Sequence, residues 1–284
     1  MLPQVRLLIA FFIYLLAGGL VMVVASIIVP ELIDPTQTGK FIFFCYGVIL
    51  LEALCLVHWS ILTKGVNIRL TAVDILLGIL FLYITVNRYW IQSVQGFSIR
   101  YYEVLALGAF YIVLRQLGPK VYPYILLSLL ASGLIQAVYG CLQWMGYYHS
   151  NNNNFMATGS FFNPGPYAGF LASVLPVALG LLIYRQKCMA LLGQSLPAKW
   201  GGIVKRTVPP ALLWLPMGAA IAILAILPVS GSRAAWVAVA VSLLVCFPFW
   251  VAEEIHWAGK GIPKTHSHRC FHFVDCRVHR NLFF

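Results

Sequence analysis

The chain has 284 residues, of which 61% are hydrophobic and only 10% are charged. A soluble domain carries about 25% charged residues, so this composition excludes a soluble globular domain and indicates an integral membrane protein. The formal net charge is +11. The enrichment of Lys and Arg on one side of a membrane accounts for this charge, so it does not require a nucleic-acid partner.

Runs of apolar residues predict about eight transmembrane helices, since each crossing of a bilayer needs about 20 apolar residues. The first run is longer than the apolar core of a signal peptide, and no small-residue cleavage motif precedes the next run, so we interpret it as an uncleaved span. The expected fold class is therefore all-α, a polytopic transmembrane helical bundle. Its predicted spans are 7–29, 41–62, 70–87, 101–117, 121–145, 166–184, 208–228 and 233–252.

The distribution of Lys and Arg predicts a cytoplasmic N-terminus, because cytoplasmic segments of membrane proteins are enriched in these residues. In this orientation the outer segments hold four of the 19 Lys and Arg residues, namely Lys40, Arg88, Arg100 and Arg233. The others fall in the inner segments or in the C-terminal tail. Lys40, Arg100 and Arg233 each lie at or next to the start of an inward-running helix, which topology does not explain.

The outer loop between the fifth and sixth spans ends in Asn163-Pro164-Gly165-Pro166. Asn favours a turn and Gly165 can adopt a positive φ. Pro166 suits the first helical position, where a missing amide N–H leaves no acceptor unpaired. Gly159 and Gly165 also let the backbone approach another group closely. We therefore expect the sixth span to begin at the outer surface with an exposed N-terminus.

A second helix start lies in PVSGSRAAW, residues 228–236. Ser230 or Ser232 can cap the eighth span, which places Arg233 in its first turn. A cation there opposes the helix dipole, so an anion is expected to balance it. Two helix N-termini and one Arg would together bind an anion such as a lipid diphosphate. The alternative is that Arg233 only reaches to the membrane surface and that the Asn-Pro-Gly-Pro segment is only a loop.

The two segments together resemble the O-antigen ligase/polymerase family, whose members are polytopic bacterial inner-membrane glycosyltransferases. The resemblance rests on TGSFFNPGPYAGFLASVLPVALGLL (158–182) and SGSRAAWVAVAVSLLV (230–245), in this order and spacing, and covers residues 157–245. It implies transfer of a glycan from undecaprenyl diphosphate, at the periplasmic face, to lipid A–core or another acceptor. No metal or other cofactor is expected, because diphosphate is already a good leaving group.

The resemblance also implies roles for individual residues. Arg233 matches the Ser-Arg position of the family and is the expected catalytic residue, stabilising the charge that builds up on the diphosphate. The free amide groups after Pro166 are expected to shape the same site. The expected substrate-binding residues are Asn163, Gly165, Tyr167, Ser232 and Arg100.

The C-terminal part departs from the family. Family members have a long periplasmic loop with a His after the Ser-Arg span, and this sequence shows no such loop, so no catalytic His is carried over. We divide the chain into N-terminal helices (1–150), a ligase-like region (151–252) and a basic tail (253–284). The preferred interpretation of the tail is a lost reading frame, which leaves a truncated chain that is inactive alone. A disordered basic tail against anionic lipid is the second interpretation.

A metal site is the third interpretation of the tail, although its spacing fits no zinc pattern. Its ligands would be His266, His268, Cys270, His272 and Cys276.

Two other functions stay open beside glycan transfer. Glu52 and Asp74 lie within apolar spans, where ionisable groups often serve a function, and they would line the path of a transporter or channel for a small solute. The blander interpretation, which the absence of a deep cation favours, is that these carboxyl groups are protonated or hydrogen-bonded and fix helix packing. The remaining alternative is a non-catalytic membrane remnant.

The outer boundary also carries a His and several aromatic residues. His149 is the only His of the outer segments, and it would be a substitute base. The aromatic residues are expected to form an interfacial belt, with stacking on sugar rings as the alternative for one or two of them. They are Tyr147, Tyr148, Phe161, Phe162, Tyr167 and Trp236.

Overall fold

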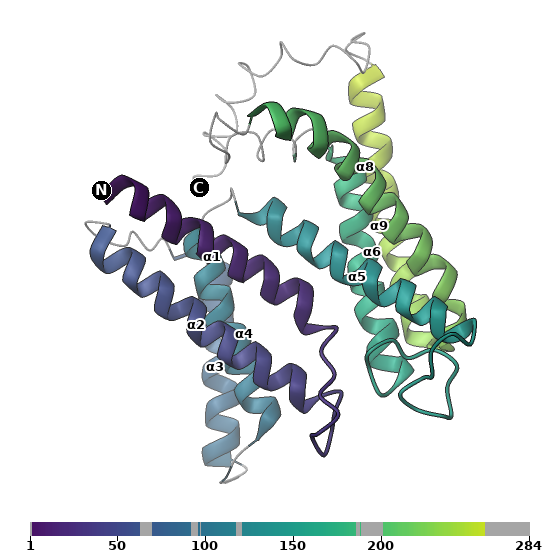
Figure 1. Cartoon of the computed structure of the whole chain (residues 1–284), viewed down its shortest axis with the longest axis horizontal. Coiled ribbons are helices and arrows are strands. Elements are labelled where there is room, and N and C mark those ends of the chain that lie inside the picture. Colours follow the sequence, from purple (N-terminus) through teal and green to yellow (C-terminus); the bar gives the residue numbers. More distant parts are fainter. Residues whose placement is uncertain are drawn as a thin grey trace. The chain divides into compact units, whose positions relative to one another are not determined.

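A computed structural model describes residues 2–62, 70–91, 96, 98–117, 121–185, 188 and 201–258. Within these residues every regular element is helical and there is no strand, which confirms the expected all-α class (Figure 1). Each predicted span overlaps one α-helix, with ends that differ by up to seven residues. The helices are α1 (Leu2–Val24), α2 (Thr38–Leu62), α3 (Ala72–Val86), α4 (Ile99–Leu117), α5 (Tyr122–Trp144), α6 (Pro164–Ile183), α8 (Gly201–Ile226) and α9 (Arg233–Ala258).

Two short helical elements complete the described part of the chain. The π-helix η1 (Asn87–Ile91) continues α3, and the 3-10 helix η3 (Pro228–Ser230) joins α8 to α9. The hinge 118–120 and the tail from residue 259 onward, with the possible metal ligands, lie outside the described residues.

Four helical segments of the described chain are long and apolar enough to cross a membrane: Thr38–Trp59, Ala72–Ile91, Tyr122–Trp144 and Pro164–Ile183. Leu8–Val24, Trp214–Ser230 and Arg233–Phe249 are apolar as well, but shorter. These surfaces are compatible with a lipid bilayer. The count of eight spans and the cytoplasmic N-terminus stay predictions.

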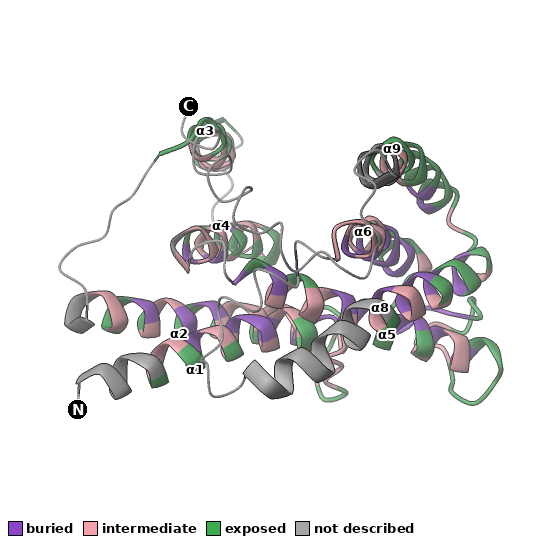
Figure 2. Ribbon diagram, turned by 90° about the horizontal axis from the view of Figure 1, so that it is seen from above, coloured by how far each residue is buried: buried purple, intermediate pink, exposed green. Residues whose placement is uncertain are grey.

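The helices bury their apolar side chains in two clusters. In the first, Ile13 and Leu20 of α1 pack with Leu51 of α2 and Val113 of α4. In the second, residues of α5, α6 and α8 pack with Ala235 and Val239 from the beginning of α9. Helix α1 contacts both α2 and α5, and so it joins the two clusters. By contrast, α3 has no buried residue, which Figure 2 shows as a helix without purple segments.

Contacts between Cα atoms group Met1–Val239 into one unit and Ala240–Phe284 into another. The described part of the second unit is the continuation of α9 to Ala258. Because α1 contacts α5 and α5 contacts both α6 and α8, the N-terminal helices and the helices α6 and α8 pack within the first unit. The division of the chain at residues 150 and 252 stays a prediction.

Asp74 has a structural explanation. It lies in the first turn of α3, where its carboxylate and Thr71 form a capping box. The same carboxylate accepts hydrogen bonds from the Tyr111 hydroxyl (2.7 Å) and from the Arg115 guanidinium (2.9 and 3.1 Å). The expectation that no cation accompanies the two acids is therefore wrong for Asp74. The alternative in which this carboxyl group fixes helix packing is the one that these contacts support.

Candidate functional site

Helix α6 begins two residues earlier than the sequence predicts. Asn163 is its N-cap residue and Pro164, rather than Pro166, occupies the first helical position. Gly165 lies inside the first turn and is not among the glycines with positive φ, whereas Gly159 has φ 55°. The expected positive φ at Gly165 is thus wrong, because the turn is made before the helix starts.

The N-terminus of α6 presents fewer free amide groups than expected. Pro164 and Pro166 have no N–H, and the amide of Tyr167 already donates to the carbonyl oxygen of Asn163 at 3.5 Å. The Asn163 side chain makes no capping hydrogen bond and accepts a bond of 3.5 Å from the Asn152 amide instead. Of the first four positions, only Gly165 therefore has an amide without a described partner, which makes this helix end a weaker anion site.

A buried glutamine of α5 holds the loop that precedes α6. The side-chain oxygen of Gln143 accepts hydrogen bonds from the backbone amides of Thr158 (3.0 Å) and Gly159 (2.8 Å). Its amide nitrogen donates to the carbonyl oxygen of Gly159 at 3.1 Å. One buried side chain thus satisfies the backbone of a loop that is itself buried at Thr158 and Ser160.

A second glutamine, two turns earlier on α5, ties this loop to the connection between α1 and α2. The Gln136 oxygen accepts from the amide of Ser160 at 3.0 Å. Its nitrogen donates to the Ser26 hydroxyl (2.9 Å) and the Ala25 carbonyl oxygen (3.3 Å). The Ser160 hydroxyl also donates to Ala25. These bonds join segments that are far apart in the sequence and fix them at the same end of α5.

Lys40 of α2 completes this junction. Its ammonium group donates to the carbonyl oxygens of Ser160 (2.6 Å) and Thr36 (3.0 Å) and lies 4.5 Å from the centre of the Phe161 ring. No carboxylate of the described residues forms an ion pair with it. Since a Lys ammonium has three N–H donors, one donor and the positive charge remain for a further partner.

The first residue of α9 is Arg233, as the sequence predicts for its first turn. Arg233 is exposed and makes no hydrogen bond or ion pair with a described residue. Ser232 precedes it, and its carbonyl oxygen accepts from the amide of Trp236 at 3.3 Å. The Ser230 hydroxyl donates to the Leu227 carbonyl oxygen at 2.6 Å and accepts from the amide of Ser232, the residue before α9, at 3.4 Å. The element η3, directly before this start, contacts both α6 and α8.

Two expected substrate-binding residues lie elsewhere. Tyr167 is fully buried, and its hydroxyl donates to the carbonyl oxygen of Gln136 at 3.1 Å. A side chain in this position packs α6 against α5 and does not present its ring to a ligand. Arg100 is exposed near the start of α4, a helix whose contacts are with α2 and α3. The contacts of the described chain therefore do not bring Arg100 to α6 or α9.

The aromatic residues predicted at the outer membrane boundary differ in their exposure. Tyr147, Tyr148, Phe162 and Trp236 are exposed, which suits an interfacial belt or contact with a sugar. Phe161 is half-buried beneath Lys40. His149 is exposed and its ring has no described partner, so no neighbouring group supports a role as base. The described residues contain no cluster of His, Cys, Asp or Glu that suits a metal ion.

Sequence reasoning did not place Lys40, Gln136 or Gln143 in the site. The two glutamines carried a usable signal, because polar side chains one heptad apart in an apolar span are expected to bond across helices. Lys40 was one of the four outer cations, but nothing in the sequence selects Ser160 as its partner.

Comparisons with protein-family models, with curated proteins and with solved structures found no match for this chain.

Proposed function

We propose that the chain takes part in glycan transfer from an undecaprenyl-diphosphate-linked donor at the outer face of a bacterial inner membrane, to lipid A–core or another glycan. The motifs at 158–182 and 230–245, which resemble the O-antigen ligase/polymerase family, support this proposal. The alternative of a small-solute transporter has less support, because Asp74 is held by Arg115, Tyr111 and Thr71.

The single observation that carries the proposal is the state of Arg233. This guanidinium stands at the first residue of α9, is exposed, and has no carboxylate partner among the described residues. An Arg at this position opposes the helix dipole, so a bound anion improves its electrostatic environment. A diphosphate suits it, because Arg donates two parallel hydrogen bonds to phosphate oxygens.

In the proposed reaction a hydroxyl group of the acceptor replaces the diphosphate at the anomeric carbon of the donor sugar. The bond between this carbon and the diphosphate oxygen breaks, and negative charge builds up on the leaving group. Arg233 stabilises this charge, which is greater in the transition state than in the bound donor. We assign no general base among the described residues.

The test replaces Arg233 by Ala and by Lys in cells whose surface glycan depends on this chain. We expect Arg233→Ala to lower transfer about 100-fold, the usual effect of losing one charge-stabilising donor, and Arg233→Lys to retain part of it. Arg88→Ala is the matched control, since Arg88 is a predicted outer cation that lies over the Tyr101 ring instead. Binding of undecaprenyl diphosphate to the purified chain is measured in parallel, because binding requires no acceptor. Normal transfer and normal binding in both Arg233 variants would contradict the proposal.

A further inference from the structure

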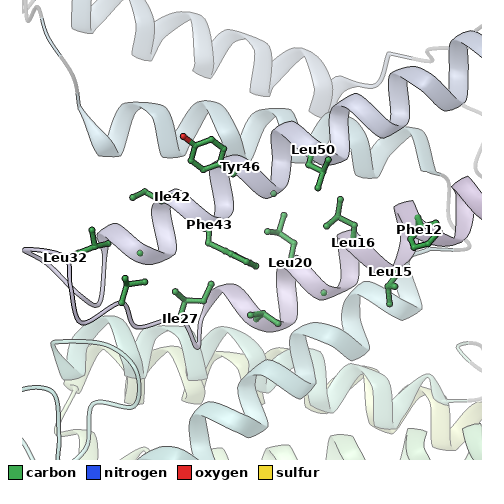
Figure 3. A pocket seen from close by; sticks show the side chains of 15 residues that line it. Phe12, Leu15, Leu16, Leu20, Ile27, Leu32, Ile42, Phe43, Tyr46 and Leu50 are labelled. Carbon is green, nitrogen blue, oxygen red and sulfur yellow. The ribbon is translucent and has the colours of Figure 1, made fainter.

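An apolar groove with a volume of about 870 Å³ runs between α1 and α2. Its α1 side extends from Phe12 to Val23, and its α2 side from Gly39 to Leu50. Ile27 and Leu32 of the connection between the two helices line one end (Figure 3), and Val29 of the same connection also lines the groove. No charged or amide side chain lines the groove, so its occupant is expected to be a hydrocarbon.

The groove has the length of one membrane leaflet. Phe12 and Val23 are eleven residues apart on α1, which corresponds to about 17 Å of helix, or roughly half of the 30 Å hydrocarbon core of a bilayer. The α1–α2 connection, which supplies Ile27, Val29 and Leu32 to the groove, meets the loop before α6 through the bond of Ser160 to Ala25 and the bonds of Gln136 to Ser160 and Ser26.

The first turn of α2 belongs to both the groove and this loop. Gly39 lines the groove, and the next residue, Lys40, donates to Ser160 and covers Phe161. Lys40 and the loop therefore lie next to the Gly39 end of the groove. The remaining N–H donor of Lys40 is available for a phosphate oxygen.

We propose that this groove binds the first isoprene units of the polyprenyl donor, with the diphosphate beside Lys40. The inference rests on the proposed function. A polyprenyl diphosphate matches the groove because it has a single chain without polar groups and carries its phosphates directly at the chain end. A phospholipid is the competing occupant, and its chains are joined through a polar glycerol unit.

Gly19 allows a direct test. It lines the groove, and a Cβ added at this position would meet no other atom within 4 Å. The Cβ of a side chain at Gly19 thus fits without moving the helices, and the ring of Gly19→Phe is expected to occupy the groove. Gly78 of α3 is the matched control, since it is equally unobstructed and does not line the groove. The probe is undecaprenyl diphosphate, titrated against the chain in nanodiscs of phosphatidylethanolamine and phosphatidylglycerol.

We expect Gly19→Phe to weaken binding of undecaprenyl diphosphate at least tenfold, Gly19→Leu to weaken it less, and Gly78→Phe to leave it unchanged. Unchanged binding in Gly19→Phe, with a loss in Arg233→Ala, would reject the groove and keep the proposed function. No binding to the unchanged chain would reject both. Loss of a co-purifying phospholipid, with undecaprenyl diphosphate binding intact, would make the groove a phospholipid site and overturn the inference.

A second measurement covers the case in which Gly19→Phe does not fold. The unchanged chain is irradiated with a polyprenyl diphosphate that carries a diazirine in its first isoprene units, and the modified peptides are identified by mass spectrometry. We expect modification within 12–50. Modification confined to α3, α8 or α9 would overturn the inference.

Discussion

Lys40 donates a hydrogen bond of 2.6 Å to the carbonyl oxygen of Ser160, 120 residues further along the chain. This bond joins the start of α2 to the loop that leads into α6. Gln136 reinforces it by binding Ser160 and the α1–α2 connection at the same time. These hydrogen bonds join the two loops at one junction.

Lys40→Met removes both hydrogen bonds and the positive charge while keeping an apolar stem of similar length. We expect a loss of about 2 kcal/mol in the free energy of unfolding, because hydrogen bonds to charged groups contribute roughly 1.5–3 kcal/mol. Donor binding should weaken in the same variant. Chemical denaturation in detergent and the undecaprenyl diphosphate titration measure the two effects. Lys40→Arg should restore part of the binding, and binding equal to that of the unchanged chain in Lys40→Met would exclude Lys40 from the site.

Gly159→Ala should destabilise the junction, whereas Gly165→Ala should be tolerated. Gly159 has φ 55°, and a Cβ there would lie 2.6 Å from the Tyr167 ring and 2.7 Å from the Gln136 oxygen. A positive φ alone costs a non-glycine residue about 1–2 kcal/mol, and the contacts add to this cost. A Cβ at Gly165 meets no atom within 4 Å, and Ala is the better helix former.

Thermal unfolding of the two glycine variants measures this difference. Gly146→Ala distinguishes the cost of a positive φ from the cost of steric contacts, since Gly146 has φ 81° but no atom within 4 Å of an added Cβ. We expect the unfolding temperature of Gly146→Ala to lie between those of Gly159→Ala and Gly165→Ala. A Gly159→Ala variant as stable as Gly165→Ala would contradict the buried position of this loop.

Gln136→Leu should loosen the loop selectively. The substitution leaves the amide of Ser160 buried without an acceptor, and an unpaired buried donor costs about 1–3 kcal/mol. Hydrogen exchange followed by mass spectrometry should show faster exchange in 157–161. Gln37→Leu serves as the control, because Gln37 is exposed. Unchanged protection of the loop in Gln136→Leu would mean that this glutamine does not hold it.

Asp74 and Arg115 should behave as a coupled pair. Single substitutions to Ala break the ion pair of 2.9 Å and leave the other charge without its partner, so each should lower stability. The double variant should lose less than the sum of the two single variants, as interacting residues do. A double-mutant cycle of unfolding free energies measures the coupling. If the losses of the two single variants add up to that of the double variant, the ion pair does not stabilise the fold.

The predicted orientation is tested by chemical accessibility. We expect Asn153→Cys, at an exposed position of the α5–α6 loop, to react in intact cells with a maleimide that cannot cross the membrane. A tag at the N-terminus should be protected from external protease under the same conditions. Cleavage of the N-terminal tag in intact cells, with Asn153→Cys reacting only once the cells are opened, would reverse the predicted topology.

The sequence by itself determined the helices. Long apolar runs interrupted by polar turns predicted the eight α-helices with described bounds, because the length and hydropathy of a segment are local properties. The position of Arg233 in the first turn of α9 followed from the same reasoning. The start of α6 was predicted two residues late, because Pro164 and Pro166 are both compatible with a first helical turn.

Only the tertiary structure decided which side chains share a site. Tyr167 looked like a surface residue of a helix start, yet its hydroxyl lies against Gly140 of α5, where only a glycine leaves room for it. Lys40 rather than Arg100 reaches the loop, because α2 contacts α1 and α1 contacts α5, while α4 contacts α2 and α3. Such neighbours result from the packing of distant helices, and neither periodicity nor hydropathy contains that information.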